Sequence, residues 1–222
     1  MDIYLEIGKT RTFAAAMDWP GWCRSGPDQA SALQALFDCA PRYARALKTT
    51  DLPFQPPSQS SELNVVERLA GNATTDFGAP NLSLARDAEA IPPAELERFQ
   101  LILQACWKTF DMAVAAATGR ALQKGPRGGG RDLQKLIEHV YQVDAAYLRN
   151  LGGKPAPVDP ADLSLALSQL RQDMLAALAA SARGEIPERG PRGGLRWTPR
   201  YFVRRLAWHE LDHAWEIEAR AE

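Results

Sequence analysis

The sequence predicts an α+β fold that is mainly α, in which a small β-β-β-α-β unit over residues 1–80 precedes a C-terminal four-helix bundle over residues 81–222. Two observations support this fold class. Short segments separated by turn residues dominate the first part, whereas long helical patterns separated by Gly/Pro-rich breaks dominate the second. The composition, with 45% hydrophobic and 24% charged residues, is that of a globular protein able to bury a core.

The N-terminal unit is expected to open with two or three short strands. Apolar residues alternate with other residues early in the segment 3–26, and turn residues punctuate it. From Asp28 to Leu47 apolar residues recur at helical spacing, although Pro41 should interrupt or kink this helix. After a Pro/Gln/Ser-rich linker, residues 62–71 are typical of one more strand.

The stretch MDWPGWCRSGPDQASALQALFD at residues 17–38 loosely resembles the HicB-type antitoxin fold. In that fold a strand and a short turn lead into a helix that covers the sheet. The resemblance implies a topology for the N-terminal unit and no antitoxin function.

The second part of the chain is expected to form four helices. The third is expected to begin at Asp159-Pro160 and the fourth at Thr198-Pro199, because each pair places an N-cap residue before a proline in the first turn. Four helices of similar length favour a four-helix bundle, and the connections are long enough to permit a crossover, so the connectivity is left open. The expected helices span 92–118, 131–151, 159–182 and 198–220.

Composition also limits the classes of partner and location. A net charge of −1 argues against nucleic-acid binding, which normally requires an excess of clustered Lys and Arg. The N-terminus lacks the apolar stretch of a signal peptide, and no apolar run approaches the length of a membrane span. A cytoplasmic location without a membrane partner is therefore expected. The scattered Cys23, Cys39 and Cys106 are interpreted as reduced structural thiols.

The feature that points to chemistry is the placement of the three histidines. His209 and His213 lie one turn apart in the last expected helix and continue an apolar stripe, so both should point into the bundle. His139 lies at the edge of the apolar face of the second helix. Three imidazoles match a catalytic metal site that keeps one position open, and bundles build such sites from facing helices.

The histidines have two alternative interpretations. A single histidine on an apolar face is more often a hydrogen-bonded core residue, but burying three without a shared partner would cost a few kcal/mol each. The run HELDH also matches the HExxH pattern of zinc proteases, in which Glu210 would be the general base. The chain ends soon after His213 without completing a metzincin motif, so a metal site with a ligand from another helix is favoured.

A histidine in KLIEHVYQVDAAYLRNLG on the second helix and the pair in WHELDHAWEIE on the last make the chain similar to the DinB/YfiT-like superfamily. The resemblance covers roughly residues 85–222. It implies a four-helix bundle that holds a divalent metal, usually zinc or nickel, through His139, His209 and His213. It also implies thiol-dependent transferase or isomerase chemistry with a low-molecular-weight thiol, and a homodimer. The N-terminal β segment and the short tail AWEIEARAE depart from many relatives, so the substrate is not carried over.

Two function classes follow as expectations. The first is a metal-dependent thiol transferase or hydrolase acting on a small molecule, because a metal held by three neutral imidazoles can activate water or a thiol. The second is a non-catalytic binding or stress-response protein in which any metal is structural. A site with an open position and a cavity of several hundred Å³ would favour the enzyme.

Charged residues around the histidines carry further alternatives. Four acids flank the histidines in sequence and could orient imidazole N–H groups, although each is more typical of a surface charge. These acids are Glu138, Asp144, Glu210 and Asp212. The last helix places Arg200, Arg204 and Arg205 near its N-terminus, against the helix dipole. Pairing with acids on neighbouring elements is the favoured explanation, and binding of an anionic substrate by Arg205 is the alternative.

Overall fold

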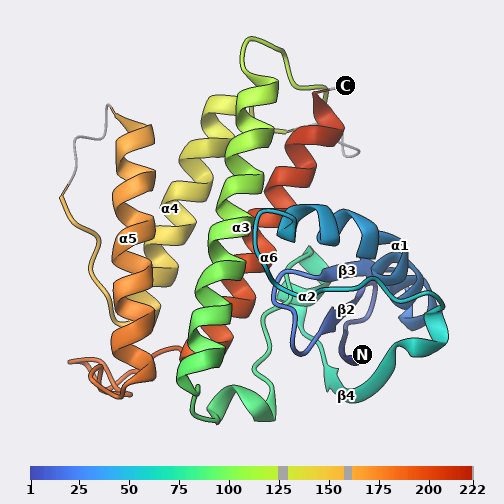
Figure 1. The fold of residues 1–222 in the computed structure, drawn as a ribbon, viewed down its shortest axis with the longest axis horizontal. Helices are drawn as coiled ribbons and strands as arrows, with labels where there is room; N and C mark the ends of the chain where they lie inside the picture. The colour runs from blue at the N-terminus through green and yellow to red at the C-terminus, as the bar shows by residue number, and fades with distance from the viewer. Residues whose placement is uncertain (125–129, 158–161, 222) are drawn as a thin grey trace.

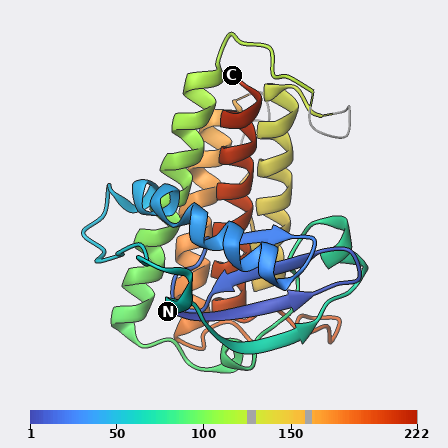
Figure 2. The same ribbon diagram turned by 90° about the vertical axis from the view of Figure 1, so that its right-hand side faces the viewer.

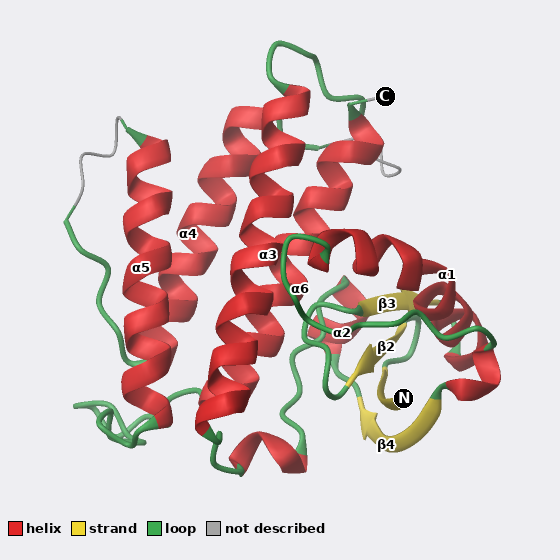
Figure 3. Cartoon of the chain, viewed as in Figure 1, coloured by secondary structure: helices red, strands yellow, loops and turns green. Residues whose placement is uncertain are grey.

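The structure, a computed structural model, describes residues 1–124, 130–157 and 162–221. It is an α+β fold with a small sheet packed beside a bundle of long helices (Figure 1, Figure 3), as the sequence predicts. The strands are β1 Asp2–Ile7, β2 Thr12–Ala16, β3 Cys23–Gly26 and β4 Asn64–Ala70. The helices are α1 Gln29–Leu47, α2 Ala73–Phe77, α3 Pro93–Ala117, α4 Leu133–Leu151, α5 Leu163–Ala182 and α6 Pro199–Arg220. Among the described residues, no helix is both long and apolar enough to cross a membrane.

The sheet has the strand order β3-β2-β1-β4. Along the chain, α1 lies between β3 and the edge strand β4. Strands β1 and β2 pair antiparallel, as do β2 and β3, whereas β1 and β4 pair parallel. The predicted β-β-β-α-β order is thereby confirmed. Figure 2 shows the sheet and α1 lying together on one side of the bundle helices.

The central strand β1 is buried on both faces rather than on one. Ile3 and Leu5 join the main core, which also contains residues of α1, while Tyr4 packs in a second cluster with Trp208 of α6. The alternation of residue types along β1 therefore does not correspond to one buried face and one exposed face. The second cover comes from α6 and from the segment that leads to the bundle, neither of which a local pattern can show.

Helix α1 runs through Pro41 as one helix, so of the two expected outcomes, an interruption or a kink, the interruption is wrong. Proline removes one backbone hydrogen bond and crowds the preceding turn. Pro41 itself is exposed, so the missing backbone hydrogen bond lies on the solvent side of the helix. Water can there donate a hydrogen bond to the carbonyl that proline leaves without a partner. The turns on either side hold because Leu36 and Tyr43 are fully buried against the sheet.

The bundle contains the four expected helices, and the structure decides their connectivity. Helices α3 and α6 run parallel, since Glu95 in the first turn of α3 binds Arg200 in the first turn of α6 at 2.6 Å. Helix α4 is antiparallel to α6, since Arg220 at the end of α6 donates to the carbonyl of Arg131, just before α4, at 2.7 Å. Figure 1 shows α5 running in the direction of α4, so the connection between them is a crossover.

Helix α5 begins later than the sequence predicts. Its first residue is Leu163, and the Asp162 side chain accepts a hydrogen bond from the backbone N–H of Leu165 at 2.9 Å. The predicted cap at Asp159-Pro160 lies outside the described residues. Asp162 competes with Asp159 because an aspartate at either place can cap a helix. By contrast, α6 begins where predicted, with Thr198 as its N-cap and Pro199 in its first turn.

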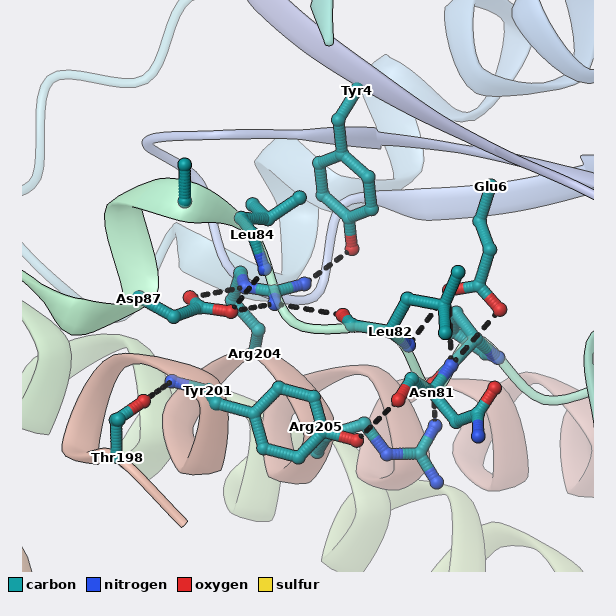
Figure 4. A network of polar contacts seen from close by, with 12 residues as sticks. Tyr4, Glu6, Asn81, Leu82, Leu84, Asp87, Thr198, Tyr201, Arg204 and Arg205 are labelled. Carbon is teal, nitrogen blue, oxygen red and sulfur yellow. Dashed lines mark hydrogen bonds and ion pairs between the residues drawn. The ribbon is translucent and has the colours of Figure 1, made fainter. Parts of the chain in front are cut away.

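A buried polar network fixes the N-terminal sheet to α6 (Figure 4). The Arg204 guanidinium donates to both carboxylate oxygens of Asp87 and, at 2.7 Å, to the hydroxyl of Tyr4 on β1. Nearby, the carboxylate of Glu6 on the same strand accepts from the backbone N–H of Leu82 at 3.0 Å. Strand β1, the segment 81–87 and α6 therefore share one set of buried charges, and the pairing predicted for the arginines is found at Arg204.

Candidate metal centre

The three histidines lie together at the junction of α4 and α6. His139 is in the middle of α4, and His209 and His213 occupy successive turns of α6, which packs against α4. One ring nitrogen from each of the three lies within 4.8 Å of the others. Among the described residues, this group contains no fourth carboxylate, thiol or imidazole. The structure therefore brings together the three residues that the sequence singles out.

Two of the imidazoles are held by carboxylates through the same ring atom. His209 Nδ1 lies 3.2 Å from the Asp144 carboxylate, and both side chains are buried, with 6% and 1% of their surfaces exposed. His213 Nδ1 lies 2.9 Å from the Glu216 carboxylate on the same helix. Because each Nδ1–H is engaged by an acceptor, Nε2 is left as the nitrogen with a free lone pair. Carboxylate-held imidazoles of this kind are the usual form of histidine metal ligands.

The surroundings of His139 and His209 keep these two rings neutral. Burial, followed by the influence of His213 and of the Arg131 cation, lowers the pKa of His139 to about 4. Burial also lowers the pKa of His209 well below its usual value, with His213 and Arg205 acting in the same direction. A metal ligand must be a neutral imidazole, so the two rings are in the ligating form at pH 7.

A cavity of about 800 Å³ opens beside the three histidines. Tyr147 of α4 and Trp208 of α6 line it from the bundle. Its opposite wall is formed by the N-terminal unit, through Arg24 of β3 and residues 77–79 at the C-terminal end of α2. The sequence does not reveal this second wall, because no local pattern relates β3 or α2 to α6. The cavity is therefore a composite of the β unit and the bundle.

Glu210 does not face this cavity. Its side chain is fully buried and lies beside Asp144, with Arg171 of α5 exerting a weaker electrostatic influence. Burial and the neighbouring Asp144 carboxyl raise the pKa of Glu210 well above its usual range, because two adjacent buried carboxyl groups cannot both ionise readily. Glu210 is therefore placed behind His209 rather than beside a reacting group, which argues against the HExxH protease interpretation.

The acids that flank the histidines in sequence have different positions. Asp144 contacts His209, whereas Glu138 is exposed and binds Gln134, and Asp212 faces Arg24 at 3.8 Å. The acid that holds His213 is Glu216, which the sequence interpretation does not include among the orienting acids. Its spacing of three residues on one helix is a signal that could identify it.

The arginines of α6 divide into two kinds. Arg200 and Arg204 pair with Glu95 and Asp87, so the structural explanation for them is confirmed. Arg205 lines the cavity and has no carboxylate partner among the described residues. Its guanidinium donates to the carbonyl of Pro80 and, at 2.7 Å, to the hydroxyl of Tyr147.

Comparisons with known proteins agree with this architecture. The family model of the DinB superfamily matches residues 102–217, a segment that contains all three histidines. No curated protein and no solved structure matches the chain.

Proposed function

The chain belongs to the DinB superfamily, and we propose that it is a divalent-metal-dependent enzyme, a thiol-dependent transferase or a hydrolase, acting on a small molecule. The observation that carries the proposal is the cluster of three imidazoles on the wall of an open cavity. A non-catalytic protein with a closed structural metal would be favoured by a fourth protein ligand and no cavity. The described residues bring together three candidate ligands beside a cavity of about 800 Å³, and this arrangement supports the enzyme proposal.

The donor set fits a divalent transition metal such as zinc or nickel. His139, His209 and His213 would hold the metal as neutral nitrogen ligands and leave its charge undiminished. When bound, such a metal supplies Lewis acidity that lowers the pKa of a water molecule or a low-molecular-weight thiol toward neutrality.

The protein's own residues prepare this site in three ways. Asp144 and Glu216 hold two imidazole rings by their Nδ1 atoms, which fixes the direction of the opposite nitrogens. Tyr147 and Trp208 form part of an aromatic wall of the cavity, and the Tyr147 ring centroid lies 5.5 Å from that of His209. The N-terminal unit supplies the facing wall and so limits the size of molecule that can reach the histidines.

Metal content is the direct test of the proposal. Tag-free protein should contain close to one divalent transition metal per chain, measured by inductively coupled plasma mass spectrometry. Metal-stripped protein should recover the same stoichiometry with zinc or nickel, and the reloaded protein should then be screened with thiol-transfer and hydrolysis substrates. Stripped protein that takes up neither metal would refute the enzyme proposal.

The carboxylates behind the histidines are expected to tune metal affinity. Asp144→Asn and Glu216→Gln should each weaken zinc binding by about 10- to 100-fold, because each removes the charged acceptor that orients an imidazole. Glu138→Gln is the matched control, since Glu138 is exposed and next to His139 in sequence without contacting it. Competition with a chromophoric chelator gives the zinc affinities of the wild type and of the three variants. Equal affinities for the wild type and for both orienting variants would contradict this role.

A further inference from the structure

The cavity beside the histidines is strongly cationic although the chain as a whole is not. The full sequence has a formal net charge of −1. The cavity, in contrast, is lined by five arginines and two carboxylates. The arginines are Arg24, Arg42, Arg131, Arg205 and Arg220, and the carboxylates are Asp212 and Glu216. Positive charge is therefore concentrated at this surface, and a bound divalent metal would add to it.

Three of the five arginines have carboxylate partners that account for their charge. The pairs are Arg24 with Asp212, Arg42 with Glu218, and Arg220 with Glu216. Arg42 also lies over the Trp215 ring, 5.0 Å from its centroid. The positions of these three arginines are explained by their ion pairs in the cavity wall. Arg205 and Arg131 have no such carboxylate partner among the described residues.

Arg205 is a buried cation without a counter-charge. Only 9% of its surface is exposed, and its hydrogen-bond acceptors are the neutral oxygens of Pro80 and Tyr147. Its Nε atom has no hydrogen-bond partner among the described residues. The guanidinium lies 4.8 Å from the centroid of the Trp208 ring, a cation–π contact at the cavity wall. Burying an uncompensated charge is costly, so this position favours a ligand that brings a negative charge.

Arg131 is an exposed residue that provides a second cation without a protein partner among the described residues. Within the described part of the chain, its guanidinium makes no hydrogen bond or ion pair. Its backbone is nevertheless fixed, because Arg220 donates to its carbonyl at 2.7 Å and also binds Glu216, the residue that holds His213. The side chain lines the same cavity as His139. A guanidinium on an anchored backbone beside the histidines is well placed to bind an oxyanion.

We infer that the small molecule bound in this cavity carries an oxyanion group, a carboxylate or a phosphate, that is held by Arg205 and Arg131 while another part of it reaches the three histidines. This inference rests on the proposed metal site and adds the substrate class. The specificity would come from the two lining arginines that have no carboxylate partner among the described residues, because the charges of the other three are already paired.

Two thiols that differ in charge test the inference on the full-length protein loaded with cobalt(II). The probes are 3-mercaptopropionate and the neutral 3-mercapto-1-propanol, which have chains of matched length. Thiolate binding to cobalt is followed by its charge-transfer absorption. The wild type should bind 3-mercaptopropionate about tenfold or more tightly than the neutral thiol, as expected for one added charge-assisted hydrogen bond.

Variants show whether the preference for the anionic thiol depends on Arg131 and Arg205 or on the positive charge of the protein in general. Arg131→Gln and Arg205→Gln should each reduce the preference for 3-mercaptopropionate while leaving the affinity for 3-mercapto-1-propanol and the cobalt content unchanged. Arg149→Gln removes an exposed positive charge from the same helix as His139 and should leave the preference intact. Because Arg205 is buried, Arg131→Gln keeps the test informative if the Arg205 variant does not fold.

The outcomes distinguish the inference from the function on which it rests. Absence of cobalt binding would overturn the proposed metal site itself. Cobalt binding with equal affinities for the two thiols, or a preference that survives both arginine substitutions, would overturn only the anionic substrate class. Inorganic phosphate that competes with 3-mercaptopropionate but not with the neutral thiol supports a site for either oxyanion. A charge preference without such competition supports a carboxylate site.

Discussion

Replacing His209 with alanine is expected to abolish stoichiometric metal binding. His209 is the most buried of the three histidines and is held by Asp144, so no other side chain can take its place without moving the helix. Its loss leaves two nitrogen ligands, and the affinity for zinc should fall by more than the roughly 100-fold expected for removal of an orienting carboxylate. Metal content by mass spectrometry and competition with a chelator measure the effect.

The other two histidines and a control complete this test. His139→Ala and His213→Ala should lose metal in the same way, because one ring nitrogen of each belongs to the same group within 4.8 Å. Gln142→Ala on α4 is an exposed control that should retain metal. Circular dichroism of each variant shows whether the fold is kept. Wild-type affinity in any folded histidine variant would mean that this histidine is not a ligand.

The second large effect is expected at the network that joins the sheet to α6. Asp87→Ala should lower the free energy of unfolding by about 3–5 kcal/mol, because it leaves the buried Arg204 guanidinium without its carboxylate partner. Tyr4 and the carbonyl of Leu82 remain as acceptors, but neither carries a charge. Urea denaturation followed by circular dichroism gives the difference from the wild type.

A partly exposed ion pair provides the matched comparison for Asp87. Asp18 pairs with Arg86 at 2.5 Å, and 47% of the Asp18 side-chain surface is exposed. Asp18→Ala should therefore cost no more than about 1 kcal/mol. If Asp87→Ala is no more destabilising than Asp18→Ala, the buried network does not fix the N-terminal unit to α6 in the way proposed here.

The long helices could be predicted because their signals are local. In α6, Thr198 and Pro199 mark the first turn, and the apolar stripe that contains His209 and His213 follows from the period of the helix alone. Where two local signals compete, the prediction fails by a few residues, as with Asp159 and Asp162 before α5. At Pro41 a correct local rule is overridden, because burial of the flanking turns in the core outweighs one lost backbone bond.

The candidate site was only partly predictable from the sequence. Its three histidines could be identified, whereas its walls come from segments that are distant along the chain. Three histidines are rare enough in this sequence to be selected by inspection. The contact between His209 and Asp144 spans 65 positions, and that between Arg204 and Asp87 spans 117. The residue type alone does not show whether an acidic side chain binds a buried partner or lies on the surface. Asp144 and Glu138 lie on the same helix and look alike in sequence, yet one is buried against an imidazole and the other is exposed.

The sequence by itself determined the α+β fold class, the order of the strands and the long helices, and the placement of three histidines on two helices, because each depends on spacing along the chain. Only the tertiary structure decided the crossover between α4 and α5, the burial of both faces of β1, and the composite cavity between the β unit and the bundle. It also decided that Arg204 is neutralised by Asp87 while the adjacent Arg205 is not. Pairing of charges depends on which side chains meet in space, and neighbours one residue apart on a helix point in directions about 100° apart.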